Sequence, residues 1–352
     1  MVSLLKKQKT SSRKTKIICT IGPSSKTEVT IKKMILEGMD LARFNFSHGH
    51  LEEFQRWARI IRKLSKKLKK KVGIIQDLQG PRIRIGKLLT EGRQINTGSK
   101  VTLVLGDSGL HRGEIPVASD IELNLKKGDR VLMDRGLVEL EVKKSDGEKA
   151  VCIALTSGLI FSGKGVNIPS IQTEEAFTKK DLKDLEEGLK MGVDYIALSF
   201  VEERKDIEDL REIVKGKVKI IAKIERPQAI KNYEEILKVS DAVMIARGDL
   251  GIEIPYYKLP IIQKRAIRRA INAGKTSIVA TDMMASMAVS SRPTRAEILD
   301  VANAVMDGAS AVMLSDETAV GKHPICAVRA MRQIIEEAEK FSHAQKLNSL
   351  LD

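Results

Sequence analysis

Charged and polar side chains follow several apolar segments of this chain, and their types suit one kind of chemistry. Lys223-Ile224-Glu225 ends one such segment, and Arg247-Gly248-Asp249-Leu250-Gly251 ends the next. Carboxylates are the ligands that Mg²⁺ and Mn²⁺ prefer, and arginine and lysine neutralise phosphate groups. The glycine-rich stretch predicts a turn whose backbone amides could hold an anion. Cations, a divalent metal and amide donors in one place are what phosphoryl transfer requires.

The same pattern recurs at other segment ends. They read Arg43-Phe44-Asn45-Phe46-Ser47, Asp77, Ser199, Thr281 and Ser315-Asp316-Glu317-Thr318. Because side chains alternate along a strand, Arg43, Asn45 and Ser47 are expected to point the same way, as are Lys223 and Glu225. One strand-end aspartate is more often structural, but seven segment ends of matching chemistry favour a common site.

The apolar segments themselves are typical of strands that are covered on both sides. The predicted strands are Lys16–Thr20, Asp40–Phe46, Gly73–Leu78, Tyr195–Phe200, Lys219–Glu225, Ala242–Arg247, Thr276–Thr281 and Ala311–Ser315. The predicted helices are Thr27–Glu37, Glu52–Lys70, Lys179–Met191, Glu203–Lys215, Pro227–Leu237, Leu259–Ala273, Thr294–Met306 and Pro324–Lys340. This alternation indicates an α/β protein with a (β/α)₈ TIM barrel, in which reactive groups collect at the C-terminal ends of the strands. A doubly wound open sheet is the alternative, because counting strands does not prove closure.

One stretch breaks the alternation of strands and helices. Short β-like segments at Lys100–Leu105, Arg130–Met133, Leu137–Val142 and Ala150–Leu155 are separated by Gly-Asp and Asp-Gly turns. We interpret the stretch as a small all-β domain inserted after the third barrel strand. The predicted organisation is a basic N-terminal tail at 1–14, a barrel at 15–86 and 158–342, and an inserted β domain, or lid, at 87–157.

Composition narrows the class of protein. The 352 residues carry a formal net charge of +15, with 42% hydrophobic and 30% charged residues. No apolar run reaches the roughly 18 residues that span a bilayer, and the three cysteines lack metal-ligand spacing, so we expect a cytoplasmic protein with no membrane partner. Much of the positive charge lies between Arg56 and Lys71, on the outer face of a predicted amphipathic helix. We therefore favour a solvated basic face over a nucleic-acid surface.

Motifs of other chemistries fail on inspection. Gly274-Lys275-Thr276 resembles the end of a P-loop, but Arg269 stands where the first glycine belongs, and the stretch precedes a strand. The histidines form no HExxH pair, and no GxSxG sequence is present.

Several segments together resemble the pyruvate kinase family, from about Thr15 to Lys340. The resembling motifs are Thr15-Lys16-Ile17-Ile18-Cys19-Thr20-Ile21-Gly22-Pro23, Ala42-Arg43-Phe44-Asn45-Phe46-Ser47-His48-Gly49, Asp77-Leu78-Gln79-Gly80-Pro81, Lys164-Gly165-Val166-Asn167, Ala222-Lys223-Ile224-Glu225, Ala246-Arg247-Gly248-Asp249-Leu250-Gly251 and Arg292-Pro293-Thr294-Arg295-Ala296-Glu297. The resemblance implies a phosphotransferase that moves the phosphoryl group of phosphoenolpyruvate to ADP, giving pyruvate and ATP, the last step of glycolysis.

The resemblance also implies roles for individual residues. Catalysis is expected from Lys223, Thr281 and Arg43, and substrate binding from Arg43, Lys223, Gly248, Asp249 and Thr281. A divalent ion, Mg²⁺ or Mn²⁺, is expected on Glu225 and Asp249. Nucleotide contacts are expected from Asn45, His48, Arg84 and Lys164, and a monovalent-cation pocket from Asn45, Ser47, Asp77 and Leu78. The family often forms tetramers, and we expect a homo-oligomer here, a dimer.

Four departures from the family pattern carry expectations of their own. Arg82 stands where potassium-dependent members have Glu, and we hypothesise that it replaces the monovalent cation, so that K⁺ is not required. Asp282 adds a negative charge beside Thr281, and Asp316 replaces a glycine, which alters a backbone angle if glycine supplied one. The chain ends just after the last expected barrel helix, so we expect no activation through a C-terminal effector domain.

The alternatives are a catalytically weakened pyruvate kinase-like protein, another metal-dependent phosphoenolpyruvate or pyruvate enzyme such as an aldolase or lyase, and a nucleic-acid-binding protein.

Overall fold

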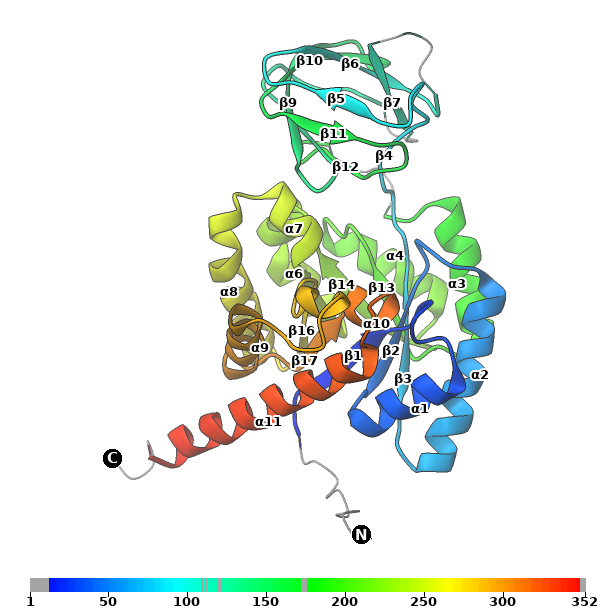
Figure 1. The fold of residues 1–352 in the computed structure, drawn as a ribbon, viewed down its shortest axis with the longest axis vertical. Helices are drawn as coiled ribbons and strands as arrows, with labels where there is room; N and C mark the ends of the chain where they lie inside the picture. Colours follow the sequence, from blue (N-terminus) through cyan, green and yellow to red (C-terminus); the bar gives the residue numbers. More distant parts are fainter. Residues whose placement is uncertain (1–12, 109–110, 112, 119–121, 172–175, 349–352) are drawn as a thin grey trace.

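Eight parallel strands close into a barrel in the order β1-β17-β16-β15-β14-β13-β3-β2 (Figure 1). The computed structural model describes residues 13–108, 111, 113–118, 122–171 and 176–348. The barrel strands are β1 (Lys16–Thr20), β2 (Leu41–Asn45), β3 (Gly73–Asp77), β13 (Tyr195–Leu198), β14 (Lys219–Ile224), β15 (Ala242–Ala246), β16 (Thr276–Ala280) and β17 (Ala311–Leu314). Since β1 pairs with both β2 and β17, the barrel is closed, and the predicted barrel is confirmed over the open sheet.

Helices surround the barrel and cover the outer faces of its strands (Figure 1). They are α1 (Glu28–Glu37), α2 (Leu51–Leu68), α3 (Lys179–Met191), α4 (Arg204–Val214), α5 (Pro227–Lys231), α6 (Tyr233–Val239), α8 (Leu259–Asn272), α9 (Arg295–Met306) and α11 (Pro324–Asn348), with shorter helices α7 (Arg247–Glu253), α10 (Asp316–Ala319), η1 (Tyr256–Lys258) and η2 (Ala285–Ala288). Threonine N-caps begin three of them, at Thr27, Thr178 and Thr294, and the last two form capping boxes. In α2, Phe54, Trp57 and Ile61 pack inward, and its arginines and lysines other than Arg62 face solvent, as predicted.

The barrel interior is filled by side chains and is not a pore. Ile18, Ile75, Ile221, Met244 and Ile278 belong to one buried cluster drawn from different strands. A separate, larger cluster lies between the strands and the surrounding helices. The reactive groups are therefore confined to the ends of the strands.

The insertion forms its own β structure above the barrel (Figure 1). One mixed sheet has the order β12-β8-β9-β10-β6-β7-β4, and a ribbon pairs β11 with β5. The strands are β4 (Arg84–Ile85), β5 (Arg93–Ile95), β6 (Lys100–Leu105), β7 (Glu114–Ala118), β8 (Arg130–Met133), β9 (Val138–Ser145), β10 (Lys149–Ala154), β11 (Gly158–Ile160) and β12 (Val166–Asn167). Its hydrophobic core runs from Ile83 to Ile171. Because this core is continuous, we propose boundaries near 83 and 171 for the inserted domain, wider than 87–157.

The two connections between barrel and insertion run side by side. The Ile85 amide donates to the Lys164 carbonyl at 2.8 Å, and the Val166 amide donates to the Ile83 carbonyl at 3.0 Å. The hinge is therefore a two-stranded ribbon and not a pair of independent linkers.

Two local predictions were wrong. The single helix predicted at Pro227–Leu237 is two helices, α5 and α6, which meet at Asn232. The Asn232 backbone, with φ of −93° and ψ of 12°, departs from helical geometry, and its side chain donates to the Glu202 carbonyl at 2.8 Å. The glycine-rich turn predicted at 247–251 is the start of helix α7.

Candidate active site

Lys223 occupies the centre of a buried charged network at the C-terminal end of the barrel. Its Nζ lies 3.1 Å from Asp77 Oδ1 and 2.9 Å from Glu225 Oε1, and it donates to Ser199 Oγ at 2.7 Å. Lys223 and Glu225 are two residues apart near the end of β14, so their side chains share a face, as predicted. Strands β3, β13 and β14 are neighbours in the barrel, which brings Asp77 and Ser199 to the same spot.

Charge pairing decides the ionisation of this network. Burial alone would lower the pKa of Lys223, but the carboxylates of Asp77 and Glu225 outweigh burial and leave its pKa raised. Burial would raise the pKa of Asp77, but Lys223 and Arg43 outweigh it and hold that pKa below its usual value. Lys223 is therefore a fixed ammonium group at the barrel mouth.

Arg43 adjoins this network from strand β2. Its Nε donates to Asp77 Oδ2 at 2.6 Å, and its Nη1 donates to Thr20 Oγ1 at 3.0 Å. Within the described part of the chain, no hydrogen bond engages its Nη2. Arg43 and Lys223 thus flank one buried carboxylate, and the guanidinium keeps one donor group for an anion.

The Glu225 carboxylate is held in place by a backbone amide from the end of the neighbouring strand. Its Oε2 accepts a hydrogen bond from the Phe200 amide at 2.8 Å, and Phe200 has a left-handed backbone with φ of 56°. Burial raises the pKa of Glu225; Lys223 lowers it, but the nearby charge of Asp249 raises it again. Two carboxylates that repel each other in this way gain stability when a cation arrives between them.

The acidic residues fit a divalent ion only in part. Among the residues that the structure describes, no group of three or more histidine, cysteine or acidic side chains could hold a metal. Glu225 and Asp249 are a pair, and Mg²⁺ is commonly held by one or two carboxylates with substrate oxygens and waters completing the shell. The pair therefore fits a metal that binds together with a substrate.

Two residues that are expected to bind the substrate, Gly248 and Thr281, meet at a strained turn after β16. Thr281 and Asp282 have φ of 74° and 55°, an uncommon conformation for residues with side chains. A Cβ on Gly248 would lie 2.8 Å from Thr281 Cγ2, so only glycine lets α7 approach this closely. The structure thus brings Gly248 and Thr281 together, as the resemblance implied.

Arg247 holds the strained turn, a role that sequence reasoning missed. Its Nε and Nη2 donate to the Thr281 carbonyl at 3.0 and 2.7 Å, and its Nη1 lies 2.7 Å from Asp300 Oδ2. Arginine directly before Gly248-Asp249 was the available signal, but its partner lies on the next strand, which spacing does not reveal.

Of the residues that are expected to contact the nucleotide, His48 and Arg84 lie at the hinge side of the mouth, and Lys164 does not face it. Burial, then the positive charges of Arg84, Arg82 and Arg43, lower the pKa of His48, which indicates that these cations surround it. Arg84 donates to the Gly163 carbonyl at 3.0 Å. Lys164 instead lies 3.5 Å from Asp134 of the insertion, so in this conformation it faces the lid.

The oxygens of the expected monovalent pocket accept hydrogen bonds from protein groups. Both Asp77 oxygens are paired with Arg43 and Lys223, and the Leu78 carbonyl accepts from Ser199 Oγ at 2.6 Å. Asn45 Oδ1 accepts from the Ser47 amide at 3.2 Å. Arg82 points elsewhere, with its Nη2 3.7 Å from Asp249 Oδ1. The ion pairs of the described residues therefore place the Arg82 charge beside Asp249 and not on Asp77.

Asp316 raises no backbone problem. It begins helix α10, and φ is not positive there. An acidic residue in the first turn of a helix is favourable, and because φ is not positive, this position does not require glycine.

A closed parallel barrel with a lysine, an arginine and paired carboxylates at its C-terminal mouth, under a hinged β domain, defines a barrel enzyme that handles anionic substrates. A family model described as "Pyruvate kinase, barrel domain" matches residues 12–328. The chain belongs to the pyruvate kinase family.

Individual relatives agree with the family model. A pyruvate kinase of Thermococcus litoralis is 43% identical over 335 residues, covering 94% of this chain and 70% of the relative. One from Mycobacterium tuberculosis is 42% identical over 338 residues, covering 95% and 72%. A solved pyruvate kinase from Cryptosporidium parvum superimposes with a TM-score of 0.89 at 38% identity, covering 93% of this chain and 70% of that one. No helix among the described residues is long and apolar enough to cross a membrane.

Proposed function

We propose that this chain transfers the phosphoryl group of phosphoenolpyruvate to ADP and releases pyruvate and ATP. The observation that carries the proposal is the Lys223 ammonium fixed between Asp77 and Glu225, with Arg43 on the other side of Asp77. Two cations held against buried carboxylates are preorganised for a substrate rich in negative charge. Preorganisation matters because the charged groups need not rearrange as the reaction proceeds.

Each group has a proposed task at the barrel mouth. Arg43 grips the phosphate, and Lys223 neutralises the phosphoryl group during transfer. The amides of Gly248 and Asp249 and the Thr281 hydroxyl hold the substrate carboxylate. After transfer, Thr281 or a water that it orders protonates the enolate, whose ketonisation drives the reaction forward.

Glu225 and Asp249 are proposed to hold Mg²⁺ or Mn²⁺, which supplies charge neutralisation between the two phosphate-bearing substrates when bound. Asn45, His48, Arg84 and Lys164 are proposed to contact ADP. Closure of the inserted domain would exclude water, so that the phosphoryl group reaches ADP and is not hydrolysed.

A homodimer in the cytoplasm is the proposed form of the protein. Val289 and Leu299, two large apolar side chains that are 68% and 63% exposed, flank the Arg292–Glu297 segment in the sequence. Light scattering behind size exclusion measures the state directly, and a monomer at micromolar concentration would contradict the dimer.

The decisive experiment is a coupled assay for pyruvate with the purified chain, phosphoenolpyruvate, ADP and Mg²⁺. We expect saturable pyruvate formation that stops when the metal is chelated. The control omits ADP, which tests whether phosphate goes to a nucleotide or to water. Binding of phosphoenolpyruvate without turnover would favour the catalytically weakened alternative.

A further inference from the structure

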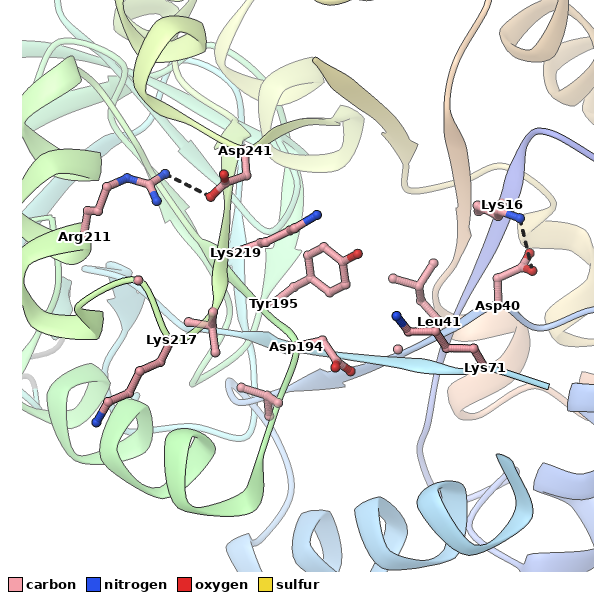
Figure 2. A pocket seen from close by; sticks show the side chains of 14 residues that line it. Lys16, Asp40, Leu41, Lys71, Asp194, Tyr195, Arg211, Lys217, Lys219 and Asp241 are labelled. Carbon is pink, nitrogen blue, oxygen red and sulfur yellow. Dashed lines mark hydrogen bonds and ion pairs between the residues drawn. The ribbon is translucent and has the colours of Figure 1, made fainter. Parts of the chain in front are cut away.

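A second concave site lies at the opposite end of the barrel from the catalytic mouth. It is a cavity of about 670 Å³, lined by the first residues of five neighbouring strands: Lys16, Leu41, Gly73, Tyr195 and Lys219 (Figure 2). A volume of this size is within the range of pockets that hold small molecules. Gly73 leaves room here, because a Cβ at that position would lie 3.3 to 3.5 Å from Leu41 and Tyr195.

The carboxylates at this cavity are already engaged. Asp40, Asp194 and Asp241 each precede a barrel strand, and Oδ2 of each accepts a backbone amide of the adjacent strand. The donors are Ile17, Ile74 and Ile220, at 2.8, 2.7 and 2.8 Å.

The same three carboxylates also carry arginine partners. Asp40 pairs with Arg13, and Asp194 and Asp241 pair with Arg62 and Arg211, each at 2.9 Å. The negative charges at the cavity are thus neutralised by protein groups that fasten this end of the barrel, and they leave the cavity's lysines uncompensated.

The lysines of the cavity have weak partners or none. Within the described ranges, Lys71 and Lys219 form no ion pair, and Lys16 lies 3.9 Å from Asp40. In Figure 2 the Lys71 and Lys219 side chains and the Tyr195 hydroxyl extend toward the middle of the cavity, whereas Lys217 turns away. Unpaired ammonium groups around a concave surface concentrate positive potential inside it.

We propose that this cavity is a binding site for a small polyanion that carries at least two phosphate groups. Lys71 and Lys219 contact the phosphates, and Tyr195 contributes a hydroxyl donor. A compact ligand fits better than a nucleic acid, because the lysines surround an open hollow and do not follow an extended groove. The site is independent of the proposed kinase reaction, since it shares no residue with the catalytic mouth.

The test is calorimetric titration of inorganic pyrophosphate into the protein without divalent metal or substrates. The wild-type chain is expected to bind, and the Lys71→Ala/Lys219→Ala variant is expected to bind at least about tenfold more weakly. The matched control, Lys205→Ala/Lys322→Ala, removes two exposed lysines elsewhere and lowers the net charge equally. It is expected to bind as the wild type does.

Four results would overturn the proposal. One is no binding to the wild-type chain up to about 10 mM, a very weak affinity. Another is equal weakening in the control variant, which would indicate general surface charge. The third is loss of pyrophosphate binding in Lys223→Met together with unchanged binding in Lys71→Ala/Lys219→Ala. That result would locate the anion at the catalytic mouth. A short single-stranded RNA, titrated in parallel, would displace the small-anion assignment if it bound more tightly than pyrophosphate and lost binding in the same double variant.

Discussion

Arg226 Nε lies 3.1 Å from Glu253 Oε2 and joins the end of strand β14 to helix α7. Both side chains are buried, and each also holds the returning hinge. Arg226 Nη2 donates to the Ile168 carbonyl at 3.3 Å, and Asn167 Nδ2 donates to Glu253 Oε1 at 3.0 Å. This ion pair therefore ties the inserted domain to the helix that carries Gly248 and Asp249.

Glu253 should make stability depend on pH. Burial raises its pKa to about 7, although Arg226 and Asn167 oppose the shift, compared with 4.5 when unperturbed. The folded state then binds more protons than the unfolded state between these values, so the free energy of unfolding falls as pH rises from 4.5 to about 7. In Glu253→Gln this contribution, at most about 3 kcal/mol, is absent. Urea unfolding of the wild type and Glu253→Gln at several pH values measures this contribution. If the free energy of unfolding depended on pH in the same way in both proteins, Glu253 would not be its source.

Lys223→Met should abolish most of the proposed activity. The loss is expected to be about a thousandfold or more in kcat, because the charge is used on the transferring group. The substitution also leaves Asp77 and Glu225 without their shared cation, which destabilises the fold by about 3–5 kcal/mol. Circular dichroism must therefore accompany the assay. Lys190→Met, at an exposed lysine, is the control. A folded variant with near-normal turnover would remove Lys223 from its role.

Glu225→Gln should weaken the binding of the divalent metal ion. The neutral amide keeps the shape of the carboxylate but loses its charge, so the Mg²⁺ concentration for half-maximal rate should rise at least about tenfold. Glu337→Gln is the control, because it removes one carboxylate charge from an exposed glutamate of helix α11. An unchanged metal dependence in Glu225→Gln would count against the ligand assignment.

Gly248→Ala should lower the activity because the new methyl group clashes with Thr281. The new methyl group would meet Thr281 Cγ2 at 2.8 Å and push the turn out of place. Thr281→Ser removes that methyl group and keeps the hydroxyl, so the double variant should recover much of what Gly248→Ala loses. The ratio kcat/KM for phosphoenolpyruvate measures both effects. A double variant no better than Gly248→Ala would mean that the clash is not the cause.

Added potassium should be unnecessary for turnover. Arg82 supplies a fixed positive charge at the mouth, 3.7 Å from Asp249, while Lys223 and Arg43 neutralise Asp77. We expect equal rates in sodium, potassium and tetramethylammonium salts at one ionic strength. Arg82→Glu is expected to create potassium dependence. Strong activation of the unmodified chain by potassium would refute the hypothesis.

Local pattern was enough to predict the barrel and several residues of its mouth. Buried strands read as continuous apolar runs, and a residue at a strand end lies at the mouth once the barrel closes. That reasoning paired Lys223 with Glu225 correctly. It missed strand β7, because Pro116 in its middle lowers the strand signal. It missed Arg247 and Arg226 as well, because each acts on a carbonyl or carboxylate far away in sequence.

Because the hinge strands lie side by side, the inserted domain is connected to the barrel at a single junction. Since Ile83 and Val166 are already hydrogen-bonded to each other, the chain leaves and re-enters the barrel at nearly one point. Loop-closure entropy grows only slowly with length, by about 0.6 kcal/mol per doubling, so a loop of some eighty residues costs the barrel only about 2–3 kcal/mol more than a short turn would. A polypeptide in which a few glycines bridge these positions would be expected to keep the eight-stranded scaffold, and domains of other kinds could be grafted at the same junction.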